Sequence, residues 1–352
     1  MKDSILAGAV ALSLVATTAC APEQDVQPDM HGVAQESDSE AAGVTVVFQE
    51  WEVPGGVDTF PHDPAFAPDG SGWYAGYMAN VLGRVDATTG EITEFTLPTE
   101  NSGPHGLVAD GQGHIWYTGH RVSLIGQLNP QTGEVVEYPM PDPAVSDPHT
   151  PIFDQEGVLW FTAQNANYVG KLDPESGEVT VKELATADAM PHGIDISQSG
   201  IPFFDMSGTN KIGSIDPETM EITEYGLPEG ARPRRIAVTN DNTVWYTDLA
   251  RGFLGRLDPA TGQVEEFPSP GGSESEPYGI AATSDGVIWY SESGVQPNTL
   301  VRFDPETGSM HAWPLPSSES TVRHMVAAPD DTLWLACSGS GTVVHVRIDD
   351  HN

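Results

Sequence analysis

A unit of about 43 residues recurs from residue 62 to the C-terminus, and this repeat constrains the fold more than any other feature of the sequence. Each unit carries Pro-His-Gly or a variant of it, then an aromatic residue, then a turn related to Asp-Pro-x-Thr-Gly. A period of this size with strand-like filling predicts a radial array of β-sheets rather than a chain of separate domains. The aromatic residues lie 43, 44, 43, 42, 44 and 45 residues apart, at Trp73, Trp116, Trp160, Phe203, Trp245, Trp289 and Trp334.

The second unit shows how such a repeat folds. Residues 106–109 and 114–118 are short runs of apolar, aromatic and β-branched residues, which is typical of strands. Residues 123–128 and 134–138 read as two further strands, and Asn-Pro-Gln-Thr-Gly at 129–133 supplies the turn between them. Four antiparallel strands per unit correspond to one propeller blade.

The two ends of the repeat predict a closed ring. Six full units fit between residues 62 and about 316, and a seventh begins near Arg323 but ends after its third strand. Thr45–Pro54 resembles the outer strands of the other units, so we expect it to complete the seventh blade. An open β-solenoid is the alternative, but a ring removes the exposed sheet edges. The sequence therefore predicts an all-β, seven-bladed β-propeller over residues 45–352, closed by the N-terminal strand.

The residues before the repeat have the composition of an export segment. Lys2, an apolar run and small residues up to Cys20 are typical of a signal peptide over residues 1–20. Thr-Thr-Ala-Cys resembles a lipobox, so we expect either a lipid anchor at Cys20 or simple secretion. The apolar run is too short to span a bilayer as a helix. Residues 21–44 are polar and acidic, and we expect a flexible linker there.

The charge balance limits the possible partners. The formal net charge is −37, with 51 acidic and 14 basic residues. A protein that binds nucleic acid needs a basic surface, so this class of partner is excluded. We expect a monomer that binds a small molecule or an oligosaccharide.

Polar residues occupy one equivalent position in all seven units, at the start of the innermost strand. Since these strands line the central channel of a propeller, we expect the seven side chains to surround one mouth of the channel. Neutral His can bind metal or transfer protons, and Arg favours carboxylates and phosphates. The series predicts a ligand site, although buried hydrogen-bonded His could equally line the channel. Its members are His62, His105, His149, His192, Arg234, Tyr278 and Arg323.

The sixth unit adds two carboxylates. Glu276 precedes the innermost strand, and Glu292 ends the antiparallel neighbour of that strand. Both should therefore reach the mouth that holds Tyr278. Two carboxylates and water suit Mg²⁺ or another hard divalent cation. The alternative is a pair of exposed acids among the many on the surface.

The repeated unit resembles that of the virginiamycin B lyase (streptogramin lyase) family over nearly all of residues 45–348. This resemblance implies a magnesium-assisted elimination that opens a cyclic depsipeptide, with a His removing the α-proton. Glu276 and Glu292 match the two metal carboxylates of the family in type and spacing. The catalytic His is replaced by Tyr278, and a substrate-contacting His of the preceding blade is replaced by Arg234.

These residues support more than one function. The first is a metal-assisted carbon–oxygen lyase, in which Tyr278 acts as acid or base and Arg234 and His192 orient the substrate. Its substrate could be a lactone or a uronate-containing polysaccharide. The second is a non-catalytic binding propeller, because a fold alone does not determine function. The third is a transition-metal centre on the four His, which requires a narrow channel.

Overall fold

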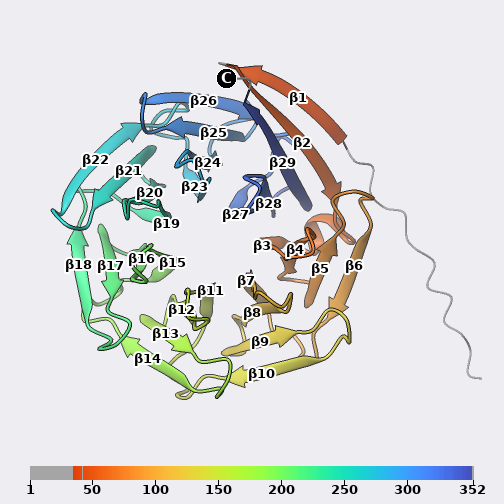
Figure 1. Ribbon diagram of the computed structural model, residues 1–352, viewed down its shortest axis with the longest axis vertical. Coiled ribbons are helices and arrows are strands. Elements are labelled where there is room, and N and C mark those ends of the chain that lie inside the picture. The colour runs from red at the N-terminus through yellow and green to blue at the C-terminus, as the bar shows by residue number, and fades with distance from the viewer. Residues whose placement is uncertain (1–34, 42, 351–352) are drawn as a thin grey trace, which may run out of the picture. The chain divides into compact units, whose positions relative to one another are not determined.

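The computed structural model describes residues 35–41 and 43–350, and these form the seven-bladed β-propeller that the repeat predicted (Figure 1). Seven antiparallel sheets surround one axis, with the first strand of each repeat innermost. The predicted signal peptide and Cys20 lie outside the described residues. In the part of the chain that the structure does describe, no helix is both long and apolar enough to cross a bilayer.

Blades 1 to 6 follow the chain in order, and each has four strands in sequential order. Blade 1 contains β3 (Pro61–Phe66), β4 (Gly72–Gly76), β5 (Val81–Val85) and β6 (Ile92–Thr96). Blade 2 contains β7 (Pro104–Ala109), β8 (Ile115–Gly119), β9 (Leu124–Leu128) and β10 (Val135–Pro139). Blade 3 contains β11 (Pro148–Phe153), β12 (Leu159–Ala163), β13 (Tyr168–Leu172) and β14 (Val179–Glu183).

The remaining three of these six blades have the same plan. Blade 4 contains β15 (Pro191–Ile196), β16 (Pro202–Met206), β17 (Lys211–Ile215) and β18 (Ile222–Gly226). Blade 5 contains β19 (Pro233–Val238), β20 (Val244–Asp248), β21 (Phe253–Asp258) and β22 (Gln263–Pro268). Blade 6 contains β23 (Pro277–Ala282), β24 (Ile288–Glu292), β25 (Thr299–Asp304) and β26 (Ser309–Pro314).

Blade 7 joins the two ends of the propeller chain. Its inner strands are β27 (Val322–Ala327), β28 (Leu333–Cys337) and β29 (Thr342–Asp350), and its fourth strand is β2 (Val44–Glu52). The pairing of β2 with β29 runs from Val44–Asp350 to Glu52–Thr342, which confirms closure by the N-terminal strand. A single 3₁₀ turn, η1 (Gly56–Asp58), then leads into blade 1.

Blade 7 also has a fifth strand that the sequence did not predict. Residues Gln35–Ala41, expected to be part of a flexible linker over 21–44, form β1 and pair antiparallel with β2. The prediction was wrong for this stretch because β2, as an outer strand, presents unpaired N–H and C=O groups that a neighbouring segment can satisfy. The polar composition of β1 gave no alternating pattern from which to predict it.

The core lies between the blades and repeats with them. The aromatic residue of each second strand is buried, and Trp51 of β2 stacks on Trp334 with ring centroids 6.0 Å apart. The Gly in the third strand has a steric purpose, because a Cβ at Gly83 would overlap the ring of Tyr74. The same Gly–ring contact recurs at Gly126, Gly170, Gly213 and Gly255. The recurring Gly and aromatic residues of the repeat therefore specify how the strands of each blade pack.

Candidate functional site

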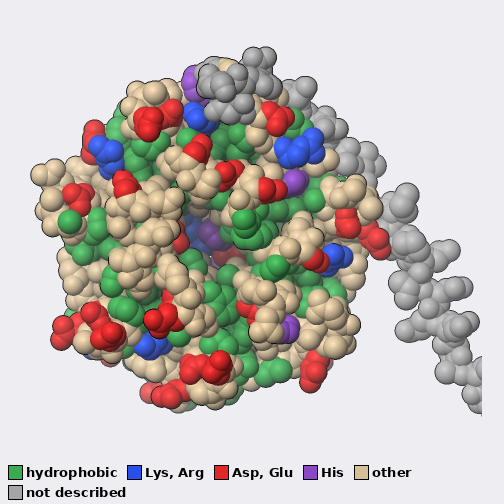
Figure 2. Space-filling view, viewed as in Figure 1, with side chains coloured by type: hydrophobic (Ala, Val, Ile, Leu, Met, Phe, Trp, Pro, Cys, Tyr) green, Lys and Arg blue, Asp and Glu red, His purple; other side chains and the backbone are tan. Residues whose placement is uncertain are grey.

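The structure brings the seven predicted channel residues together, each as the second residue of an innermost strand. Neighbouring His rings are in contact, with centroids 3.6 Å apart for His62–His105, 3.9 Å for His105–His149 and 4.1 Å for His149–His192. All four rings are between 0% and 5% exposed. The channel is thus narrow at this level and packed with imidazoles. The space-filling view shows a hollow at the centre of the ring, with His and Lys or Arg colours in its depth (Figure 2).

A second layer of polar residues lies one position further along the same strands. Asp63, Thr150, Arg235 and His324 occupy it in four blades. The other blades carry Gly, and a Cβ at Gly193 would lie 2.7 Å from a carboxylate oxygen of Asp205. The sequence interpretation missed this layer, although the replacement of the Gly of Pro-His-Gly in four units was a visible signal.

Arg235 ties this layer together across the axis. Its guanidinium donates to Asp63 Oδ1 at 2.8 Å, to Thr150 Oγ1 at 2.8 Å and to the Arg323 carbonyl at 3.2 Å. These contacts link blades 1, 3, 5 and 7. Burial alone would raise the pKa of the Asp63 carboxyl, but the adjacent Arg235 charge holds that pKa well below its usual range. Asp63 is therefore a buried carboxylate with its counter-ion supplied by the fold.

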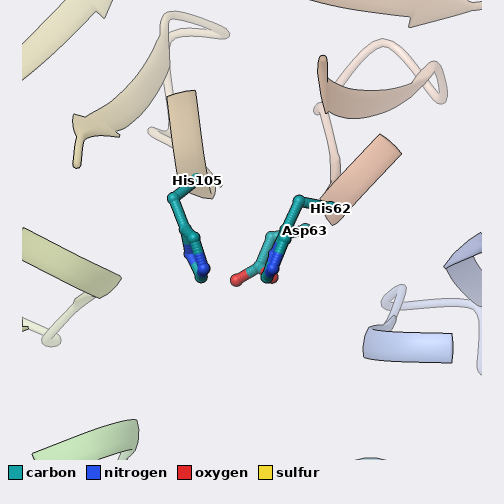
Figure 3. Close-up of side chains that lie close together, drawn as sticks. All are labelled: His62, Asp63 and His105. Atoms are coloured by element: carbon teal, nitrogen blue, oxygen red, sulfur yellow. The ribbon is translucent and has the colours of Figure 1, made fainter. Parts of the chain in front are cut away.

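His62, Asp63 and His105 form a group whose ligand atoms lie within 4.8 Å of one another (Figure 3). Such a group could hold a transition metal. However, Asp63 Oδ1 already accepts hydrogen bonds from Arg235 and from His62 Nδ1, the latter at 2.8 Å. A cation bound there would have to displace or face a buried guanidinium, so the surroundings of this group disfavour a metal.

Burial keeps the four channel His neutral. Desolvation lowers the pKa of His62 to about 4 and that of His105, His149 and His192 well below the ordinary value, and nearby guanidinium charges lower them further. His149 Nδ1 lies 2.9 Å from Thr150 Oγ1, which orients that ring. Neither ring nitrogen of His192 has a hydrogen-bond partner among the described residues. His192 Nδ1 lies 3.9 Å from Asp205 Oδ2, beyond hydrogen-bond distance, so this ring has unused hydrogen-bonding capacity.

Tyr278 and two arginines complete the ring on the side opposite the His. Tyr278 is buried, and its hydroxyl accepts a hydrogen bond of 2.8 Å from the Arg234 guanidinium. The Arg323 guanidinium lies over the Phe60 ring at 5.1 Å and donates to Ser338 at 2.8 Å. Both arginines are half-buried. The phenol oxygen thus lies beside a positively charged guanidinium.

The two predicted metal carboxylates lie at neighbouring strand ends but in different environments. Pro277, which follows Glu276, pairs with Glu292, and the Ser293 amide donates to the Glu276 carbonyl at 3.2 Å. The Glu276 side chain is exposed, whereas Glu292 is 1% exposed. The Glu292 carboxylate accepts hydrogen bonds of 2.6–2.7 Å from Ser269, Gly271 and Thr299.

The backbone at Glu276 has a structural explanation. Its φ of 47° is matched at the equivalent residue of five other blades, which lie at 48–58°. The left-handed conformation therefore belongs to the blade repeat and is not a strain specific to this site. These residues are Phe60, Gly103, Asp147, Met190 and Thr321.

Asp205 is a further buried acid that sequence reasoning missed. In four other blades a Thr or Ser at this position donates its hydroxyl to the next inner strand, as Thr162 does to the His192 carbonyl at 2.7 Å. Asp205 instead accepts from the Gly193 amide at 2.6 Å, and burial raises its pKa well above the ordinary value.

Comparison with known proteins agrees with this architecture. The profile of the Virginiamycin B lyase family matches residues 43–206 and 200–351. The chain belongs to the Virginiamycin B lyase family. A structure described as streptogramin B lyase is 26% identical, with a TM-score of 0.79 over 88% of this chain and 100% of that one. Virginiamycin B lyase from Staphylococcus aureus is 24% identical, with a TM-score of 0.77 over 86% of this chain and 99% of that one.

The fold extends to proteins of other function. Hydrazine synthase from Kuenenia stuttgartiensis is 16% identical, with a TM-score of 0.69 over 82% of this chain and 96% of that one. At this identity the likeness shows the propeller alone. A search among curated proteins gave no match. Function therefore has to be argued from the residues at the channel mouth.

Proposed function

We propose that this member of the Virginiamycin B lyase family is a metal-assisted carbon–oxygen lyase that acts at the channel mouth around Tyr278. The observation that carries the proposal is the hydrogen bond between Tyr278 and Arg234, at the position where the family resemblance implies the proton-removing His. A phenol beside a guanidinium can give up and take back a proton, which is the capability that an elimination needs.

The residues would divide the reaction between them. Tyr278 Oη removes the proton α to a carbonyl, the electron pair of that C–H bond forms a double bond, and the ester C–O bond at the β-carbon breaks. The ester oxygen leaves as part of a carboxylate. Arg234 stabilises the phenolate, while the packed neutral rings of His149 and His192 exclude water from one side. The substrate is a cyclic depsipeptide lactone. In the alternative, a uronate-containing polysaccharide, the bond that breaks is the glycosidic C–O bond at the β-carbon, and its oxygen leaves as a sugar hydroxyl with the proton that Tyr278 removed.

Glu276 and Glu292 are the residues that would hold a divalent cation. Carboxylate oxygens are the ligands that Mg²⁺ prefers, and the two residues lie on paired strand ends. When bound, the ion would polarise the substrate carbonyl and so acidify the α-proton. The hydrogen bonds of Ser269, Gly271 and Thr299 fix the orientation of the Glu292 carboxylate, as outer-shell partners of metal ligands do.

One observation favours the second candidate, a non-catalytic binding propeller. Both oxygens of Glu292 already accept hydrogen bonds, from Ser269 after blade 5 and from Thr299 of blade 6, so this carboxylate can be explained as a buried structural group. Calorimetric titration with MgCl₂ separates the two functions. Saturable binding to the wild type, lost in Glu276→Gln, supports the lyase. Equal heats of MgCl₂ titration for the wild type and the variant would support the non-catalytic binding propeller instead.

Product analysis tests the reaction class. The protein is incubated with a cyclic streptogramin B depsipeptide, with and without Mg²⁺, and the molecular mass of the product is measured by mass spectrometry. Elimination opens the ring without a change in mass, whereas hydrolysis adds one water. A magnesium-dependent, isobaric, ring-opened product supports the proposal. A product one water heavier would refute the proposed mechanism, and an unchanged lactone would call for the same assay on an oligouronate.

Export also belongs to this proposal. The apolar run before Cys20 and its lipobox-like ending support a protein that is anchored outside the cytoplasm by lipid, or secreted. Metabolic labelling with a radioactive fatty acid, with Cys20→Ser as the control, tests the anchor. Label on both proteins, or on neither, would contradict it.

A further inference from the structure

The axis carries more guanidinium charge than the adjacent carboxylate balances, in an otherwise very acidic protein. Three guanidiniums surround it, from Arg234, Arg235 and Arg323, and only Arg235 has a carboxylate partner, Asp63 at 2.8 Å. Within the described residues, no carboxylate lies within ion-pair distance of Arg234 or Arg323. Asp205, the other buried acid near the axis, accepts a hydrogen bond from the Gly193 amide at 2.6 Å and lies within ion-pair distance of neither guanidinium. Two cations therefore remain uncompensated.

This arrangement differs from that of arginines elsewhere in the molecule. Arg84, Arg251 and Arg256 each pair with a carboxylate. Arg121 and Arg232 have no such partner among residues 35–41 and 43–350, but they are exposed, so water solvates them. Arg234 and Arg323 are half-buried, and Arg234 Nε is a buried donor with no acceptor. A buried charge that lacks both a counter-ion and its full set of hydrogen bonds is costly, unless a ligand supplies them.

The neighbouring groups also suit an anion better than a cation. Four neutral imidazoles line the other side of the axis, and His192 has both ring nitrogens unpartnered. A neutral imidazole can donate one N–H to an anionic oxygen. The fork of a guanidinium matches the two oxygens of a carboxylate. The guanidiniums and neutral imidazoles at this level are thus donors of the kind that a planar anion accepts from.

We propose that Arg234 and Arg323 hold a carboxylate of the ligand at the channel mouth. This inference rests on the proposed function for the origin of the carboxylate. The elimination would release the ester oxygen as a carboxylate at the channel mouth, and its negative charge must be stabilised there. A uronate ligand would carry the same group before reaction. In both cases Arg234 has two partners, the Tyr278 oxygen and the ligand carboxylate, so it couples the acid–base group to the developing charge.

Binding calorimetry without turnover tests this proposal. Two acid–ester pairs serve as probes, N-acetylphenylalanine with its methyl ester and trigalacturonate with its methyl ester, all in EDTA. The first acid represents the carboxylate that elimination would release. The second represents the carboxylate that a uronate carries before reaction. We expect at least one acid to bind about tenfold or more tightly than its ester, and to lose that preference in Arg234→Met and Arg323→Met. Arg84→Met, on the outer part of blade 1, serves as the matched control and should retain it.

The outcomes are distinct from those of the lyase assay. If neither acid binds better than its ester, or if the preference survives in both Arg variants, the proposal is wrong. Arg234→Lys and Arg323→Lys guard against misfolding, since they keep the charge and should retain part of the preference. A protein that prefers carboxylates but shows no elimination with any substrate would refute the lyase alone. Elimination without carboxylate preference would refute only this inference.

Discussion

The buried pair of Asp63 and Arg235 should contribute strongly to the stability of the ring. The two side chains are at most 1% exposed, and Arg235 reaches blades 1, 3 and 7 from blade 5. Asp63→Asn keeps the shape and one acceptor oxygen but removes the charge that balances the guanidinium. Breaking a buried ion pair on one side costs about 3–5 kcal/mol. We expect the free energy of unfolding to fall by about 3 kcal/mol, measured by urea denaturation with tryptophan fluorescence.

Two comparisons isolate the cause of this loss. Glu265→Gln breaks a pair with Arg256 in which both side chains are largely exposed, and it should cost less than about 1 kcal/mol. In the double variant Asp63→Asn/Arg235→Met no charge remains uncompensated, so the cost should be well below the sum of the single variants. A loss for Asp63→Asn as small as that of the Glu265 control, or additive costs in the double variant, would refute the reasoning.

Two further predictions concern the fold. Folding lowers the pKa of His62 from 6.5 to about 4, so the folded state binds fewer protons there, and stability should be lost as the pH falls from 6.5 towards 4. Asp195, whose pKa burial raises to about 6, acts in the opposite sense as the pH rises through that range. Urea denaturation at several pH values should show that the free energy of unfolding falls less steeply with decreasing pH in His62→Gln than in the wild type or His114→Gln. Equal slopes in the three proteins would contradict the assignment of this pH dependence to His62. Trp51→Ala should lower the free energy of unfolding by about 3–5 kcal/mol because it empties the blade 7 interface against Trp334; a loss below about 1 kcal/mol would mean that β2 does not close the ring.

Much of the fold was predictable because the same structural signals recur from one repeat unit to the next. The turn, the aromatic residue and the third-strand Gly recur in register, and the incomplete seventh unit required the strand that became β2. The placement of His62 and its equivalents followed from their position at the start of each innermost strand. β1 was not predictable, since its residues are polar and show no alternating pattern, and its pairing depends on the free edge of β2.

The chemistry of the axis was less accessible from the sequence. The contact between Arg235 and Asp63 joins residues 172 positions apart, and it depends on the channel width. That width is set by how the blades pack and not by any local motif. The raised pKa of Asp205 likewise depends on burial, and the hydrogen bonds of Glu292 depend on the connection between blades 5 and 6. The sequence could identify these residue types but not their charge states or partners.

The most direct test of the proposed function is the rate of magnesium-supported ring opening in the wild type and in Tyr278→Phe. Phe keeps the ring and its packing against Arg234 but removes the oxygen that takes the proton. General acid–base catalysis typically contributes about 10²–10⁴-fold, so the isobaric product should form at least about a hundredfold more slowly in the variant. A Tyr278→Phe variant that opens the lactone at the wild-type rate would contradict the assignment of Tyr278 and with it the proposed mechanism.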